Sequence, residues 1–123
     1  MAQALRILIV DDSAPMRFVL RGYLEEAGHE VVAEASDQDE ALKFYGTLKP
    51  DIVTLDLSLV KGDGVGVLKA LRQIDPRVKV LVVSGNCQQK IQEIVQSAGA
   101  VGFLGKPFEP GELQEALSRA VKP

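Results

Sequence analysis

The residues of this 123-residue chain that are suited to chemistry stand at the ends of short apolar runs. In chain order they are Asp11 with Asp12, Asp56, Ser84, and Lys106 with Pro107. Carboxylates bind hard divalent cations, whereas a lysine ammonium and a hydroxyl hold the oxygens of a tetrahedral anion. If the fold gathers these side chains, they form a metal-assisted site for phosphate.

A carboxylate can itself be the nucleophile in phosphoryl transfer and become an aspartyl phosphate. Three carboxylates in one small volume repel one another unless a cation is present or some of them are protonated. Oxygen ligands without His or a nearby Cys favour Mg²⁺ or Mn²⁺ over Zn²⁺. We therefore predict a Mg²⁺ site at Asp11, Asp12 and Asp56, with Asp56 as the phosphoryl acceptor and no organic cofactor.

The elements that must position these residues are indicated by two alternating periodicities. Short β-branched runs predict strands over 5–10, 31–35, 52–55, 78–83 and 101–104. Apolar residues at helical spacing lie between and after these strands. The first helix is expected to begin at Ser13 and Pro15 and to end before Gly28. Residues 36–40 are expected to cap the second helix, and the third helix is expected to cover about 64–75.

Five alternating β/α units predict parallel strands joined by right-handed crossovers. The first, third and fourth strands are almost purely aliphatic, as expected for central strands, whereas Glu30, Glu34 and Gly102 mark the second and fifth as edges. This pattern predicts an α/β fold, a flavodoxin-like doubly wound (βα)5 sheet of order 2-1-3-4-5 with helices on both faces. Ligands of such sheets bind beyond the carboxyl ends of the strands, where the candidate residues lie.

Composition narrows the classes of function. The 14 Lys+Arg and 17 Asp+Glu give a net charge of −3, which argues against a direct nucleic-acid partner. A membrane-spanning helix needs about 20 apolar residues, far more than any apolar run here, so no membrane insertion is expected. One cysteine and the absence of a signal-like N-terminus predict a cytoplasmic protein. The length of 123 residues predicts a single domain over 1–123.

Taken together, the residues that follow the strands resemble the response-regulator receiver domain of two-component signalling, in its stand-alone chemotaxis-type form. The resemblance covers essentially the whole chain, and its motifs are Asp11-Asp12 after an aliphatic strand, Asp56 at the end of residues 50–56, Ser84 after a further strand, and Lys106-Pro107-Phe108. It implies that Asp56 accepts a phosphoryl group from a sensor histidine kinase or a phosphotransfer protein. It also implies that Asp11, Asp12, Asp56 and the backbone carbonyl of Ser58 hold Mg²⁺, that Lys106 and Ser84 engage the phosphoryl oxygens, and that the Lys106–Pro107 bond is cis.

The resemblance further implies a conformational switch. Ser84 moves toward the phosphoryl group and an aromatic residue, here Phe103, follows it, so that the fourth helix, fifth strand and fifth helix form the output face. Phe103 has no phenolic hydroxyl, and its coupling would rest on packing. The implied partner is a downstream protein. The resemblance also implies that the chain is a monomer or a weak phosphorylation-dependent dimer, and that it has no independent substrate turnover.

Alternatives remain at this point. A receiver fragment of a larger regulator and a phosphorelay intermediate are the alternatives to the stand-alone form. A flavin- or nucleotide-binding module and a metal-dependent phosphatase with an Asp nucleophile are more remote. Leu59-Val60 departs from the Met-Pro usual in relatives, although Asp63-Gly64 matches. His29 is expected in a solvated turn, and Cys87 as an idle thiol.

Overall fold

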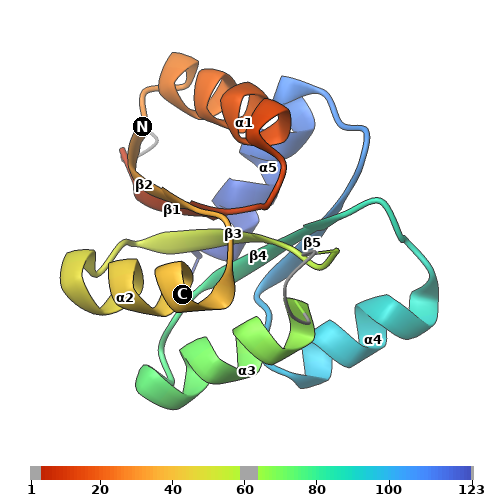
Figure 1. The fold of residues 1–123 in the computed structure, drawn as a ribbon. Coiled ribbons are helices and arrows are strands. Elements are labelled where there is room, and N and C mark those ends of the chain that lie inside the picture. Colours follow the sequence, from red (N-terminus) through yellow and green to blue (C-terminus); the bar gives the residue numbers. More distant parts are fainter. Residues whose placement is uncertain (1–3, 59–63, 123) are drawn as a thin grey trace.

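The computed structural model describes residues 4–58 and 64–122, and the expectations for residues 59–63 lie outside them. Strands and helices alternate along the chain (Figure 1). The strands are β1 (Arg6–Val10), β2 (Glu30–Ala35), β3 (Ile52–Asp56), β4 (Val80–Ser84) and β5 (Gly102–Gly105). The helices are α1 (Ala14–Glu26), α2 (Gln38–Leu48), α3 (Gly64–Ile74), α4 (Gln89–Ser97) and α5 (Pro110–Ala120).

The strands form one parallel sheet in the order β2-β1-β3-β4-β5. The fold class and strand order predicted from the sequence are confirmed. β1, β3 and β4 are the inner strands, and in β3 and β4 every residue is buried. Their carboxyl ends therefore meet at one edge, and the switch point between β1 and β3 lies in the middle of that edge.

Helices cover both faces of the sheet, with α1 and α5 on one side and α2, α3 and α4 on the other (Figure 1). Alternate residues of a strand point to opposite faces. In β1, Ile7 and Ile9 join the core under α1 and α5, while Leu8 and Val10 join the core under α2 and α3. Two-sided burial explains why the inner strands read as continuous aliphatic runs.

Local signals fix where the first two helices begin. The Ser13 hydroxyl accepts the Met16 N–H at 3.2 Å and caps α1, which also carries proline in its first turn. The Asp37 carboxylate accepts the Glu40 N–H at 2.9 Å and caps α2. Gly28, after α1, has a φ of 91°, a backbone conformation that a side chain would strain.

The expectation of a solvated His29 is wrong. Its ring is buried, with Nδ1 accepting the Leu5 N–H at 3.0 Å and Nε2 lying 3.3 Å from the Gln114 side-chain oxygen. A ring that accepts at Nδ1 must carry its hydrogen at Nε2 when neutral, so Nε2 is the donor to Gln114. His29 thus ties the start of β1 to α5.

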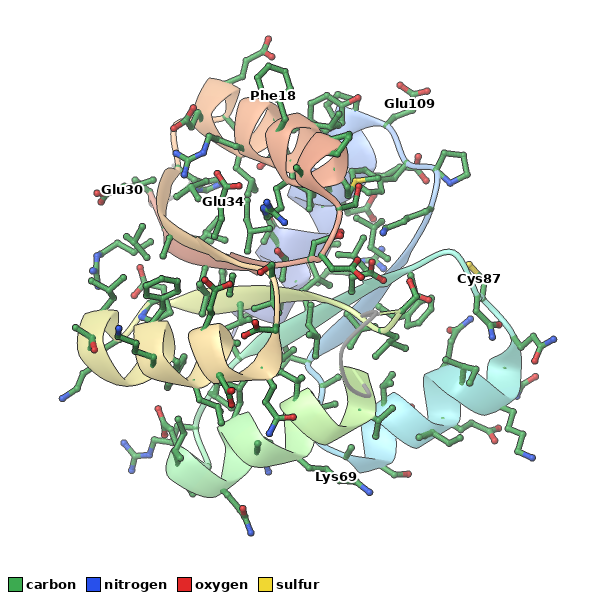
Figure 2. All side chains as sticks on the ribbon, in the orientation of Figure 1. Phe18, Glu30, Glu34, Lys69, Cys87 and Glu109 are labelled. Carbon is green, nitrogen blue, oxygen red and sulfur yellow. The ribbon has the colours of Figure 1, made fainter. Side chains whose placement is uncertain are left out.

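Two further properties concern the surface. No helix in the described part of the chain is long and apolar enough to cross a membrane. The largest exposed apolar side chain is Phe18, which is 79% exposed on α1 and projects from the helix in Figure 2.

Candidate functional site

The candidate residues come together at the carboxyl edge of the sheet, as their positions after the strands predict. Asp11 and Asp12 follow β1, and Asp56 is the last residue of β3. Ser84 ends β4, and Lys106 follows β5 directly. The carboxyl ends of four strands, β1, β3, β4 and β5, thus each place one or two polar residues at the same edge of the sheet.

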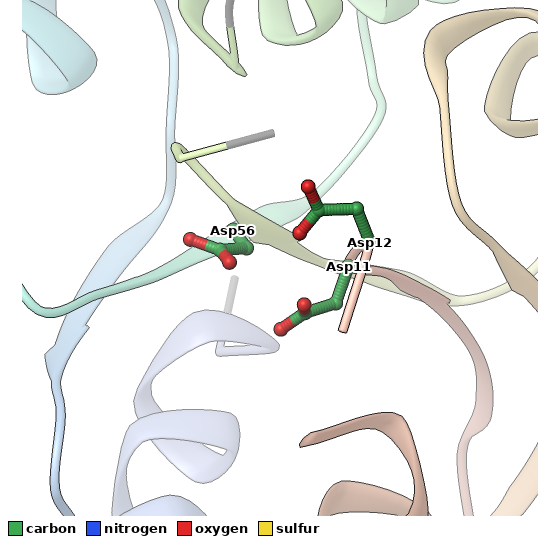
Figure 3. Close-up of side chains that lie close together, drawn as sticks. All are labelled: Asp11, Asp12 and Asp56. Carbon is green, nitrogen blue, oxygen red and sulfur yellow. The ribbon is translucent and has the colours of Figure 1, made fainter. Parts of the chain in front are cut away.

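Asp11, Asp12 and Asp56 form a cluster of carboxylates. One oxygen of each lies within 4.8 Å of the others (Figure 3). Asp11 and Asp56 are only 1% and 4% exposed, while Asp12 is partly exposed and leaves the cluster open on one side. Burial raises the pKa of Asp11, against the opposing effects of the Ser13 N–H and Lys106, because a desolvated carboxylate is costly to ionise.

Lys106 supplies a positive charge to this cluster. Its ammonium lies 3.2 Å from Oδ2 of Asp56 and 3.4 Å from Oδ2 of Asp11. The Lys106–Pro107 peptide bond is cis, as the resemblance implies. One ammonium against three carboxylates leaves the cluster with an excess of negative charge when all three are ionised.

The other carboxylate oxygen of Asp56 is held by Ser58. Both the Ser58 N–H and the Ser58 hydroxyl bond to Oδ1 of Asp56, at 3.0 and 2.9 Å. The resemblance assigned the Ser58 carbonyl to the site, and these two Ser58 donors are additional to it. They orient the Asp56 carboxylate with Oδ1 toward the loop after β3 and Oδ2 toward Lys106.

Ser84 faces its own loop. Its hydroxyl accepts the Asn86 N–H at 3.1 Å, and its carbonyl accepts the Lys106 N–H at 2.9 Å. The backbones of β4 and of the Lys106 segment are therefore joined beside the cluster. Phe103, on β5, is partly buried and packs against the core beneath α2, α3 and α4.

Two further residues, Arg17 and Cys87, lie close to the strand ends. Arg17, one turn into α1, donates from Nη1 to the carbonyl of Asp11 at 2.7 Å and was not singled out. The only available signal was a cation close after the two aspartates. Cys87 is exposed in the loop before α4, where its sulfur lies close to Gly105.

The donor chemistry of the cluster fits Mg²⁺ or Mn²⁺. Its ligating atoms are carboxylate oxygens, which hard cations prefer, and their mutual repulsion is relieved by a divalent charge. The open side at Asp12 suits Mg²⁺, which keeps several waters when few carboxylates hold it. The acidic pocket at the edge of the sheet is therefore a suitable divalent-cation site.

Comparison with known proteins gives consistent results. Residues 7–118 match the family of the response regulator receiver domain. The chain is 42% identical over 117 residues to the chemotaxis protein CheY of Thermotoga maritima, covering 95% of this chain and 98% of that protein.

Two solved structures have the same fold. One is the response regulator domain of Thermotoga maritima CheB, with a TM-score of 0.89, 32% identity, and coverage of 98% of this chain and 100% of that one. The other belongs to the CheX–CheY–BeF₃–Mg²⁺ complex from Borrelia burgdorferi, with a TM-score of 0.90, 28% identity, and coverage of 95% and 90%.

Proposed function

The chain belongs to the response regulator receiver domain family, and on that premise we propose that Asp56 is the residue that accepts the phosphoryl group. The observation that carries this assignment is the placement of Asp56: Oδ1 is held by Ser58, Oδ2 lies 3.2 Å from the Lys106 ammonium, and two further carboxylates are adjacent. The receiver passes its signal to a protein partner. Residues 1–123 are proposed to form one receiver domain.

The proposed reaction is a transfer from phosphohistidine. A carboxylate oxygen of Asp56 attacks the phosphorus, and a new O–P bond forms as the P–N bond breaks. The histidine nitrogen keeps the electron pair of the broken bond, and its ring, once protonated, leaves as neutral imidazole. The donor is a sensor histidine kinase or a phosphotransfer protein.

Asp11, Asp12, Asp56 and the Ser58 carbonyl are proposed to hold Mg²⁺, with Mn²⁺ as a substitute. When bound, the cation neutralises charge on the oxygens of the transferring group. Lys106 adds a second positive charge for these oxygens, since its ammonium already contacts the proposed acceptor. The Borrelia burgdorferi relative supports a magnesium site in this fold, because its complex contains Mg²⁺ together with BeF₃.

The switch is proposed to start at Ser84. The Ser84 oxygen accepts the Asn86 N–H, and the oxygens of a phosphoryl group on Asp56 are acceptors to which the Ser84 O–H can donate, so the hydroxyl then turns toward the site. Phe103 follows by packing, and α4, β5 and α5 change their outer surface. The partner binds this surface and, as in the CheX complex of the relative, is a protein.

Further parts of the proposal come from the sequence. The protein acts in the cytoplasm, without direct nucleic-acid contact or independent substrate turnover, as a monomer or a weak phosphorylation-dependent dimer. A role as a phosphorelay intermediate or as the receiver of a longer regulator uses the same site. The carboxylate cluster argues against a flavin or nucleotide module, because without a bound cation it would repel a cofactor phosphate.

Intact mass measurement tests the function. The protein is incubated with acetyl phosphate, with and without Mg²⁺, beside the Asp56→Asn variant. We expect one phosphoryl adduct that requires both Mg²⁺ and Asp56. An adduct of equal yield on Asp56→Asn would overturn the assignment of the acceptor.

A further inference from the structure

Arg17 contacts the backbone between the first two acidic residues of the site. Its Nη1 donates to the carbonyl of Asp11 at 2.7 Å. That carbonyl belongs to the peptide unit that joins Asp11 to Asp12. Its orientation fixes where the Asp12 N–H and Cα lie, since the unit is planar, and so sets the point from which the Asp12 side chain starts.

Arg17 is itself held in place by Glu34 on β2. Its Nε lies 3.0 Å from Oε1 of Glu34, and both side chains are largely shielded, 20% and 28% exposed. Glu34 projects from β2 toward α1 in Figure 2. The planar guanidinium thus bridges a carboxylate and a carbonyl with two separate N–H groups, which a lysine ammonium cannot reproduce in the same fork.

The remaining polar groups of Asp11 are fixed by other contacts. Its N–H donates to Ala35, Oδ1 accepts from Ser13, and Oδ2 contacts Lys106. The contact with Arg17 completes this set at the carbonyl. The N–H, the carbonyl and both carboxylate oxygens of Asp11 are therefore oriented before a cation binds. Arg17 orients the carbonyl, which belongs to the peptide unit shared with Asp12.

We propose that Arg17 is a positioning residue for divalent-cation binding: oriented by Glu34, it fixes the Asp11–Asp12 peptide unit so that both carboxylates face the same cation. This inference rests on the metal site of the proposed function. It makes the affinity of the Asp11, Asp12 and Asp56 cluster for a divalent cation depend on the ion pair between Arg17 and Glu34.

Positioning and simple electrostatics predict opposite signs. Arg17 carries a positive charge near a site for a cation, so its removal should strengthen binding if charge alone mattered. If Arg17 orients the peptide unit, its removal weakens binding, because the ligands lose their preorganised geometry. Partners of metal ligands typically contribute about 10–100-fold in affinity, and we expect about a 10-fold loss here because Arg17 acts through the backbone.

Arg21 offers a matched control. It also pairs with Glu34, at 2.6 Å, and lies one turn further along α1. Replacement of either arginine removes one cation and one ion pair to Glu34. Any loss caused by general loosening of α1 or β2 therefore appears in both variants, whereas loss of the carbonyl contact appears in the Arg17 variant alone.

The experiment is a calorimetric titration of the unphosphorylated chain with MgCl₂, repeated with Mn²⁺ by electron paramagnetic resonance. The proteins are wild type, Arg17→Gln, Arg17→Lys and Arg21→Gln, each checked by thermal unfolding. Arg17→Lys keeps the charge and secures a folded variant if Arg17→Gln does not fold.

We expect Arg17→Gln to bind about 10-fold more weakly, Arg17→Lys to fall between it and wild type, and Arg21→Gln to match wild type. Unchanged or tighter binding by Arg17→Gln overturns the inference, as does an equal loss in Arg21→Gln. A wild-type protein that binds neither metal overturns the proposed metal site itself, which is a distinct result.

Discussion

The ammonium of Lys106 lies 3.2 Å from Oδ2 of Asp56, although 50 residues separate them in the chain. Asp56 ends β3 and Lys106 follows β5, and these strands are not neighbours, since β4 lies between them. Their contact arises because Lys106 directly follows β5 and its side chain extends back across the carboxyl edge of the sheet to Asp56. The acceptor and its counter-charge are thus assembled by the sheet rather than by local sequence.

Replacing Lys106 with Met separates metal binding from phosphoryl transfer. We expect tighter Mg²⁺ binding, because a positive charge near the cation is lost, and phosphorylation by acetyl phosphate that is about 100-fold slower, because transition-state charge loses a preorganised donor. Calorimetry and time-resolved intact mass measure the two effects. Lys79→Met, which removes a lysine bonded to the Val121 carbonyl, is the control. Equal phosphorylation rates in both variants would contradict the role of Lys106.

Removal of the Asp12 carboxylate tests the metal site. Asp12→Ala should weaken Mg²⁺ binding about 10-fold or more and slow phosphorylation at fixed Mg²⁺, with recovery as the Mg²⁺ concentration rises. Asp39→Ala removes an exposed acid of α2 and should leave both quantities unchanged. Unaltered affinity in Asp12→Ala would remove Asp12 from the ligand set.

Asp11 gives a pH dependence of stability. Because burial raises its pKa above the ordinary value of 3.8, the folded state binds this proton more tightly than the unfolded state. Stability from this group therefore falls as pH rises from about 3.8 through the raised pKa, and the penalty is complete above that pKa.

Asp11→Asn should therefore stabilise the metal-free protein at pH 7. Asn retains an oxygen that accepts the Ser13 N–H but carries no charge. We expect a higher melting temperature than that of the wild type in EDTA, and this gain disappears at acidic pH. Thermal unfolding across pH checks this, with Asp39→Asn as the control. A loss of stability at pH 7 would show that the Lys106 ion pair outweighs burial.

Ser84→Ala tests the switch apart from the chemistry. Phosphorylation should proceed at nearly the wild-type rate, because Asp56 and Lys106 are intact. The response of residues 101–104 should be reduced, since no hydroxyl is drawn toward the phosphoryl group. Backbone amide shifts of these residues before and after acetyl phosphate give the measurement, with the exposed Ser118→Ala as control. A full shift in Ser84→Ala would exclude the hydroxyl from the switch.

The fold could be predicted from the sequence because its central strands are buried on both faces. The continuous aliphatic runs of β1, β3 and β4 identify inner strands, and Glu30 and Glu34 identify an edge. The ends of the strands were predicted less accurately than their order in the sheet. Val78 was included in the fourth strand, but its N–H bonds to the Asp75 carbonyl in the preceding turn, and β4 begins at Val80.

Contacts between distant residues explain what the sequence did not reveal. His29 was expected in solvent, yet Leu5 and Gln114, which are 24 and 85 residues away, bury its ring. Arg17 reaches the Asp11 carbonyl only because of the course that the backbone takes between β1 and α1. The Arg17 side chain is oriented by Glu34, which lies on β2. Strand-end positions were predictable from pattern alone, whereas the groups that orient them were not.

The most direct test of the central claim is to identify the phosphorylated residue. The protein is treated with acetyl phosphate and Mg²⁺, and sodium borohydride then reduces the acyl phosphate, which converts the modified aspartate to homoserine. Peptide mass spectrometry locates the converted position. The account predicts homoserine at Asp56 and at neither Asp11 nor Asp12. Conversion at Asp11 or Asp12, or no conversion at Asp56 when the intact protein carries a phosphoryl group, would contradict it.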